Sequence, residues 1–132
     1  MPRNENLGSV REFFDAVLNA GDMASLEKLA LRDVMVPQSV PGIEGLTRLL
    51  SEARATFGNP EYKLLETVSE GERVVARFSA KATHAGRYMG IPATGRPLKF
   101  WGVMLFGFES GAIAEFWSLV DAEGILKQLR AQ

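Results

Sequence analysis

The sequence contains no cysteine, and among its 132 residues there is a single histidine, His84. Without cysteine the chain forms no disulfide, offers no thiol nucleophile and builds no cysteine-based zinc site. One histidine also excludes a metal site made from several histidines of the same chain. We therefore expect a domain that holds no metal ion.

An excess of charge of one sign is missing, and so are long hydrophobic runs. The 15 Lys and Arg residues nearly balance the 16 Asp and Glu residues, so no overall basic field would attract nucleic acid or an anionic membrane. No apolar run approaches the roughly 18 residues of a membrane span, and the first residues, MPRNEN, lack the apolar core of a signal peptide. The length is that of one domain with a substantial core. We expect residues 1–132 to form a single cytoplasmic domain without nucleic-acid or membrane partners.

Helical periodicity marks the beginning of the chain. Ser9 and Glu12 have the spacing of a capping box, which predicts that a helix starts at Ser9. Gly21 predicts the end of that helix, and Asp22 is suited to cap a second, shorter helix. The first helix has one apolar face with helical spacing, formed by Val10, Phe13, Phe14, Val17 and Leu18.

Two further helices are expected. Pro37 and Pro41 predict an irregular segment around them. A third helix then follows over about residues 43–57, and the GNP sequence at residues 58–60 ends it. A short closing helix should begin after Asp121, whose carboxylate can accept hydrogen bonds from the free N–H groups of the first turn.

From residue 61 onward the period of the apolar residues changes from 3.6 to 2, which predicts strands. Four strands are expected, at residues 62–69, 73–84, 98–108 and 112–120. In the second of them the even-numbered residues from Val74 to His84 form an apolar face that ends at the histidine. Helices followed by consecutive strands and a closing helix predict an α+β fold.

The last two strands are expected to form a hairpin around the ESG sequence, with Gly111 in the left-handed conformation. A three-residue loop would pair Met104 with Phe116 and Gly102 with Ser118 on the face toward the helices. The opposite face is also apolar, so it needs a cover of its own, for which a second copy of the chain is the obvious candidate. We expect this dimer interface to contain Trp101, Val103, Trp117 and Leu119.

Residues 70–121, EGERVVARFSAKATHAGRYMGIPATGRPLKFWGVMLFGFESGAIAEFWSLVD, resemble the SnoaL-like polyketide cyclase family, as does the earlier FFDAVLNAGD segment. The resemblance covers nearly the whole chain, and residues 83–97 are its most specific part. The family belongs to the nuclear transport factor 2-like superfamily. This implies a cone-shaped, curved antiparallel sheet with N-terminal helices and a short C-terminal helix. It also implies a deep apolar pocket on the concave face and a homodimer through the convex face.

The resemblance implies a chemistry as well. The namesake enzymes of the family close a ring during polyketide biosynthesis by intramolecular aldol condensation, with neither a metal nor an organic cofactor. A carboxylate that acts as acid and base works there with a histidine in the pocket. On this basis we expect a small apolar or aromatic ligand and no cofactor. The candidate catalytic residues are His84, Asp121 and Ser118.

Each candidate also has a structural interpretation. His84 could take a proton from a carbon next to a carbonyl, or it could order the loop after it through hydrogen bonds. Asp121 could be the acid/base group or only a helix cap. Ser118 could orient a substrate carbonyl or be a small polar filler, and it stands where family members commonly carry an aspartate after the tryptophan. Many members also have a histidine in the loop after the second helix, where this chain reads VMVPQ.

These departures leave two functions open: a cyclase or isomerase, and a non-catalytic domain that binds or sequesters a ligand. Either function requires a pocket with mainly apolar walls. We expect its lining to include Phe14, Leu18, Leu46, Leu50, Phe57, Phe78, Met89, Phe100, Met104 and Phe116.

Overall fold

The computed structural model describes residues 2–37 and 39–131, and of residues 2–4 it describes only the backbone. Five strands form one curved sheet: β1 (Ala30–Met35), β2 (Glu61–Glu70), β3 (Arg73–Thr83), β4 (Pro97–Glu109) and β5 (Ala112–Val120). Their order across the sheet is β1-β5-β4-β3-β2. Strands β2 to β5 are antiparallel neighbours, as the alternation of apolar residues predicts. The expected α+β fold with a curved sheet is confirmed.

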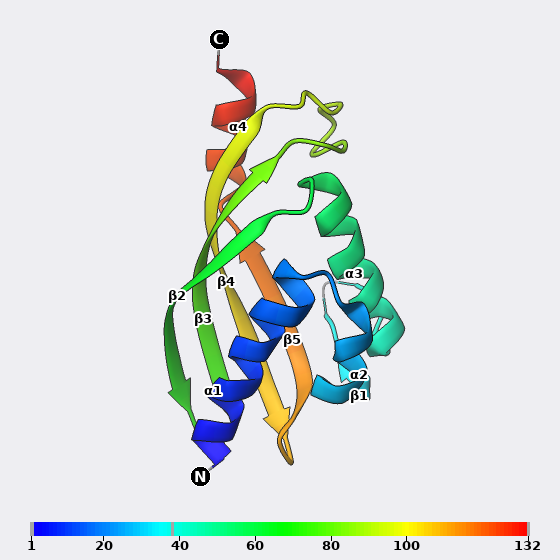
Figure 1. The fold of residues 1–132 in the computed structure, drawn as a ribbon, viewed down its shortest axis with the longest axis vertical. Helices are drawn as coiled ribbons and strands as arrows, with labels where there is room; N and C mark the ends of the chain where they lie inside the picture. Colours follow the sequence, from blue (N-terminus) through cyan, green and yellow to red (C-terminus); the bar gives the residue numbers. More distant parts are fainter. Residues whose placement is uncertain (1, 38, 132) are drawn as a thin grey trace.

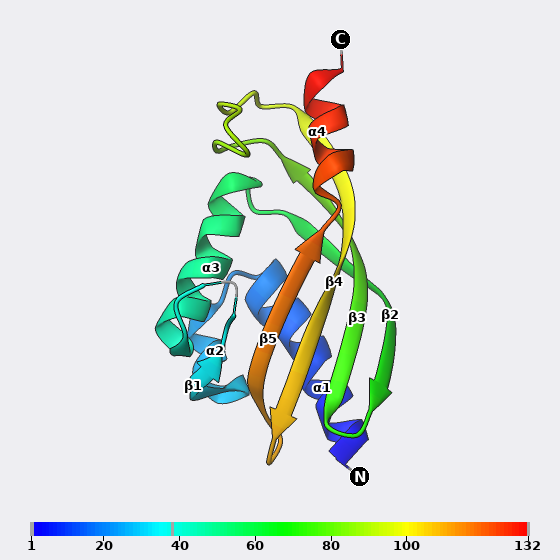
Figure 2. The same cartoon turned by 180° about the vertical axis from the view of Figure 1, so that it is seen from behind.

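Helices cover one face of the sheet. They are α1 (Pro2–Glu12), the π-helix η1 (Phe13–Asn19), the short 3-10 helix η2 (Met23–Ser25), α2 (Leu26–Leu29), α3 (Gly42–Thr56) and α4 (Ala122–Arg130). Figure 1 shows α1 in front of the sheet, α3 beside it on the side of β5, and α4 at its far end. Figure 2 shows the opposite face of β2 to β5, over which no described helix lies except α4 at the upper end of β4. No helix of the described ranges is long and apolar enough to cross a membrane.

The N-terminal helix begins earlier than expected. It starts at Pro2, so Ser9 lies inside the helix and the predicted capping box is wrong. Proline fits the first turn of a helix, and Gly8 costs an exposed helix only about 1 kcal/mol, so nothing in this segment stops the helix. The helix continues as η1, where the N–H of Ala20 donates to the carbonyl of Asp15 at 3.1 Å. It ends before Gly21, whose φ of 75° is the expected left-handed conformation.

The segment between the first and third helices contains a strand that was not predicted. Strand β1 pairs in parallel with β5, with Ala30 opposite Ile113 and Met35 opposite Glu115. Asp22 does not cap the following helix through its side chain; its Oδ2 instead accepts a hydrogen bond from Ser25 Oγ at 2.9 Å. Helix α3 agrees with the prediction to within one residue at each end.

The hairpin of β4 and β5 differs from the predicted register. Its loop has two residues, Ser110 and Gly111, both with positive φ, so Glu109 pairs with Ala112. A bulge then follows, because Phe108 pairs with Ile113 whereas Gly107 pairs with Glu115. The expected pairs of Met104 with Phe116 and of Gly102 with Ser118 are therefore wrong: Met104 faces Ser118, and Gly102 faces Val120. A shift of two residues leaves the side chains of Glu115 to Val120, beyond the bulge, on their predicted faces. Ile113, before the bulge, lies in the core instead of on the predicted outer face.

The core lies between the helices and the concave face of the sheet. Its centre is an aromatic cluster in which the Phe13 ring lies 5.1 Å from Phe106 and 5.5 Å from Phe116, between ring centroids. The opposite face leaves large apolar side chains exposed: Trp101 is 52% exposed, Trp117 39% and Leu119 65%, whereas Val103 is half-buried.

Candidate functional site

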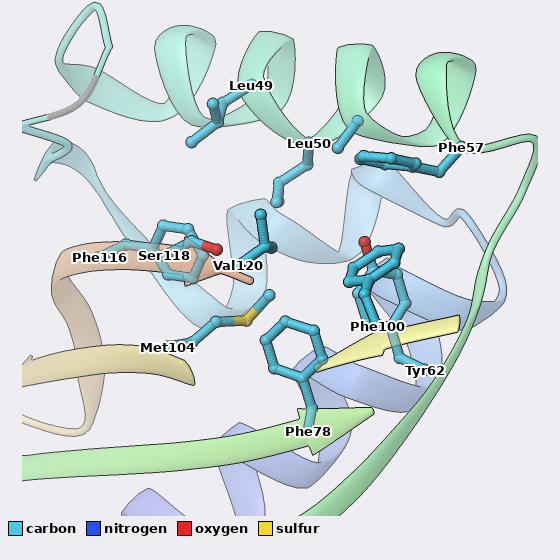
Figure 3. Close-up of a pocket in the computed structure, with 11 residues that line it drawn as sticks. Leu49, Leu50, Phe57, Tyr62, Phe78, Phe100, Met104, Phe116, Ser118 and Val120 are labelled. Atoms are coloured by element: carbon cyan, nitrogen blue, oxygen red, sulfur yellow. The ribbon is translucent and has the colours of Figure 1, made fainter. Parts of the chain in front are cut away.

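A cavity of 190 Å³ lies between α3 and the concave face of the sheet. Figure 3 shows α3 along one side of it and the strand residues along the other. None of the described residues that line it carries a charged side chain, and its polar groups are the hydroxyls of Tyr62 and Ser118, at opposite ends in Figure 3. The lining residues are Leu49, Leu50, Ala53, Phe57, Tyr62, Phe78, Phe100, Met104, Phe116, Ser118 and Val120.

Six of the expected lining residues are brought together in this cavity: Leu50, Phe57, Phe78, Phe100, Met104 and Phe116. The other four lie elsewhere. Phe14, Leu18 and Leu46 are fully buried in the core, and Met89 is exposed at the tip of a turn. The helical spacing of Leu49, Ala53 and Phe57 could have identified the α3 wall, because residues four apart lie on one face of a helix.

Tyr62 is a polar lining residue that the sequence did not single out. It lies at the start of β2, and its ring contacts Phe78 at 5.4 Å between centroids. Burial raises the pKa of its hydroxyl to about 12, against a smaller opposing effect of the Arg54 charge. The hydroxyl is therefore protonated at neutral pH and available as a hydrogen-bond donor.

His84 is fully buried, and it is not among the described residues that line the cavity. The backbone N–H of Thr94 donates to its Nδ1 at 3.2 Å, and Thr94 Oγ1 lies 2.9 Å from the same atom. Because Nδ1 accepts a hydrogen bond, a neutral His84 ring carries its proton on Nε2. Nε2 is buried and has no hydrogen-bond partner within the described part of the chain.

The loop after His84 is a small ordered structure. His84 also holds it through its backbone, since its N–H donates to the Arg96 carbonyl at 2.8 Å and its carbonyl accepts from Gly95 at 2.9 Å. At the tip, Tyr88 and Ile91 exchange two backbone hydrogen bonds around a turn in which Met89 has a φ of 48°. The Arg96 guanidinium donates to the carbonyls of the last turn of α4, Ala131 among them at 2.6 Å, and so satisfies groups that a helix end leaves unpaired.

Asp121 caps α4, as its position predicts, since its Oδ1 accepts a hydrogen bond from Gly124 N–H at 3.0 Å. Asp121 follows Val120, which lines the cavity, but it is not itself among the described lining residues. Partial burial and, to a smaller extent, the negative charge of Asp121 raise the pKa of the Tyr88 hydroxyl. The ring of Tyr88 in turn lies 5.5 Å from that of Phe57, which lines the cavity.

The described residues contain no group of three or more histidine, cysteine, aspartate or glutamate side chains placed to hold a metal ion. Glu115, the acidic residue of β5, lies on the outer face of the sheet. Its carboxylate forms an ion pair with Arg73 at 3.1 Å and accepts a hydrogen bond from the Trp117 indole N–H.

Solved structures of several other proteins have the same fold as this chain. TsrD from Streptomyces laurentii is 29% identical, with a TM-score of 0.84 and 96% of each chain covered. IdmH from Streptomyces antibioticus, a candidate polyketide cyclase, is 26% identical, with a TM-score of 0.79, and the alignment covers 96% of this chain and 99% of IdmH. A candidate SnoaL-like polyketide cyclase from Jannaschia sp. CCS1 is 21% identical, with a TM-score of 0.88 and coverage of 98% and 94%. This last likeness shows the nuclear transport factor 2-like fold.

A search of curated proteins finds no match. The model of the SnoaL-like polyketide cyclase family, in contrast, matches residues 8–129 and thus nearly the whole chain. On this match, the chain belongs to the SnoaL-like polyketide cyclase family.

Proposed function

We propose that this protein binds a small, apolar, carbonyl-bearing molecule in the cavity beneath α3 and acts on it as a cyclase or isomerase. The observation that supports this proposal is the cavity itself, an apolar space of 190 Å³ in a member of a cyclase family. Apolar walls with few polar groups are typical of small-molecule sites.

In the proposed reaction Asp121 is the acid/base group. Its carboxylate removes a proton from the carbon next to a substrate carbonyl and leaves an enolate. In ring closure the enolate carbon attacks a second carbonyl carbon of the same molecule, and the resulting alkoxide takes the proton back. Ser118, which lines the cavity, orients the carbonyl. Such acid/base catalysis contributes a rate factor of about 10² to 10⁴.

His84 has a structural role in this proposal. Its Nδ1 is engaged by Thr94, and the ring is fully buried outside the described lining of the cavity. The hydrogen bonds fix the loop whose Tyr88 packs on the Phe57 end of the cavity.

A non-catalytic ligand-binding domain is the second candidate function. It is favoured by the commitment of Asp121 to the cap of α4 and by a lining in which the described residues offer hydroxyls but no carboxylate.

Proton exchange of a simple ketone separates the two functions without knowledge of the natural substrate. The probe is phenylacetone, a single-ring ketone whose benzylic protons exchange with heavy water, which proton NMR follows. Asp121→Asn is the informative variant, because asparagine caps a helix as well as aspartate but is not a base. Glu123→Gln is the matched control, since it removes an exposed carboxylate of the same helix.

A cyclase or isomerase accelerates the exchange, and Asp121→Asn lowers that acceleration by about 10²-fold or more while Glu123→Gln leaves it unchanged. Binding of the ketone without faster exchange indicates the ligand-binding function instead. If the wild-type protein neither binds the ketone nor promotes exchange, both candidate functions are wrong.

We further propose that two copies of the chain associate through the uncovered face of the sheet. A groove of 430 Å³ on this face is lined mainly by apolar side chains, among them Val103, Trp117 and Leu119, and Trp101 is exposed beside it in β4. A face of this kind is unusual on a monomer, because contiguous exposed apolar area favours association.

A further inference from the structure

The Tyr62 hydroxyl is a polar group of the cavity whose residue is held in position from two sides. The side chain of Asn19, the last residue of η1, forms hydrogen bonds to both the N–H and the carbonyl of Tyr62. The N–H of Tyr62 donates to Asn19 Oδ1 at 2.6 Å, and Asn19 Nδ2 donates to the Tyr62 carbonyl at 2.9 Å. Strand β2 is the edge of the sheet, so this pair of hydrogen bonds replaces the partner strand that Tyr62 lacks.

The ring of Tyr62 is fixed by aromatic neighbours. It meets Phe14 edge to face, with 6.4 Å between centroids and an interplanar angle of 81°, and Phe78 at 5.4 Å. Figure 3 shows the hydroxyl on the side of the ring that faces α3, within the cavity that Phe57 and Leu50 close from the other side. A donor whose backbone and ring are both fixed loses little conformational entropy when a ligand binds to it.

The surroundings of this hydroxyl disfavour a charged ligand. Tyr62 is neutral at pH 7, as an ordinary tyrosine is, and burial raises its pKa further. The Arg54 charge that acts on it lies outside the described lining, where the guanidinium donates to the carbonyls of Leu18 and Asn19. Transfer of a carboxylate into such a space is very unfavourable, whereas a neutral carbonyl oxygen accepts one hydrogen bond and has little charge to desolvate. A purely hydrocarbon ligand would bury the hydroxyl without giving it an acceptor, which also costs free energy.

We propose that Tyr62 is the specificity-determining residue of the cavity, which donates a hydrogen bond to the carbonyl oxygen of a neutral ligand about one ring in size. This inference rests on the proposed function, since it concerns the ligand of the same cavity. The size follows from the volume: an apolar cavity of roughly 150 Å³ takes benzene, so 190 Å³ leaves space for one ring with a short substituent.

Three probes of nearly equal shape test the inference: acetophenone with a carbonyl, ethylbenzene without one, and benzoate with a negative charge. Calorimetric titration measures their affinities for the wild-type protein and for Tyr62→Phe, which keeps the ring and removes only the hydroxyl. Tyr88→Phe is the matched control, because it removes the only other tyrosine hydroxyl of the chain, which lies outside the described lining.

We expect Tyr62→Phe to weaken acetophenone binding by about three- to tenfold, the value of one neutral hydrogen bond, and to leave ethylbenzene binding equal or tighter. Tyr88→Phe should change neither affinity, and benzoate should not bind to any of the three proteins. Retained ethylbenzene binding also shows that the Tyr62→Phe cavity is intact.

The possible failures are distinguishable. If acetophenone and ethylbenzene both bind but Tyr62→Phe weakens neither, or weakens both equally, the role of Tyr62 is refuted while the proposed function stands. Benzoate binding as tight as that of acetophenone overturns the restriction to neutral ligands. If no probe binds to the wild-type protein, the proposed function and this inference both fail.

Discussion

Replacement of His84 by alanine should destabilise the fold and leave the cavity functional. The ring is fully buried, and Thr94 is bound to its Nδ1 through both the backbone N–H and the hydroxyl. His84→Ala removes the acceptor of the Thr94 N–H, but Thr94 itself is exposed, so water can replace the imidazole there. The cost therefore comes mainly from the vacated ring volume, about 2–5 kcal/mol for a large-to-alanine substitution in a core. We expect a loss of this size, a large part of a typical free energy of unfolding of about 5–15 kcal/mol.

Urea denaturation followed by tryptophan fluorescence measures this loss of stability. A double-mutant cycle shows how much of it belongs to the interaction of His84 with Thr94. Thr94→Val keeps the side-chain shape and removes the hydroxyl, which also accepts from the Arg96 N–H at 3.2 Å. If the two side chains act together, His84→Ala and Thr94→Val should show an interaction energy of about 0.5–3 kcal/mol. The folded His84→Ala protein should bind acetophenone as the wild type does. Unchanged stability combined with lost binding or lost ketone exchange would refute the structural role.

Three further predictions concern other parts of the molecule. Tyr62 has a folded-state pKa of about 12 against an ordinary value of 10, so its contribution to stability is present below pH 10 and is lost as the pH rises toward 12. In alkaline denaturation, Tyr62→Phe should therefore lose less stability over this pH range than the wild type does. An identical loss of stability in the two proteins would contradict the raised pKa of Tyr62. Sedimentation should give a dimer at micromolar concentration and a monomer for Trp117→Lys, whereas a monomeric wild type would refute the proposed interface. Gly45→Ala should lower the free energy of unfolding by about 1–3 kcal/mol, because the added Cβ would overlap the Val40 carbonyl. Gly8→Ala, in the middle of α1 with open space around it, should raise the free energy of unfolding by about 0.5–1 kcal/mol. Thermal melts in which the two variants behave alike would contradict the close approach at Gly45.

Local periodicity was sufficient for most of the fold. The change of period near residue 61 located four strands, and the apolar spacing in residues 43–57 located α3. These elements could be predicted because each of them buries one face, and the spacing of apolar residues along the sequence shows which face that is. The face of Ser118 was also correct, although its partner on β4 was not.

The features that were missed depend on contacts between distant segments. Strand β1 pairs with β5 about 80 residues away, and no alternation marks its six residues. The bulge between β4 and β5 adds a residue that lets Ile113 and Phe116, three positions apart, both point to the core. The turn residue Met89 has a positive φ, which its residue type does not indicate.

The candidate site was predictable to a similar degree. Strand alternation placed Phe78, Phe100 and Met104 on the cavity face. The same alternation placed His84 at the end of an apolar face, but its ring is buried outside the described lining of the cavity. The hydrogen bonds from Thr94 to His84 could not be predicted, because the geometry of the intervening loop determines them. Tyr62 was missed because its orientation depends on the Asn19 side chain, which lies 43 residues away.

The most direct test fills the cavity and asks whether ligand binding disappears. Ala53 lines the cavity from α3, and Ala53→Leu adds three carbon atoms there; Ala55→Leu, on the exposed side of the same helix, is the matched control. Calorimetric titration with acetophenone should show binding to the wild type and to Ala55→Leu. Ala53→Leu should lose more than about tenfold in affinity and gain up to about 2 kcal/mol in stability, from the apolar surface that it buries. Undiminished affinity in a folded Ala53→Leu protein would show that the ligand binds elsewhere and would contradict the proposed site.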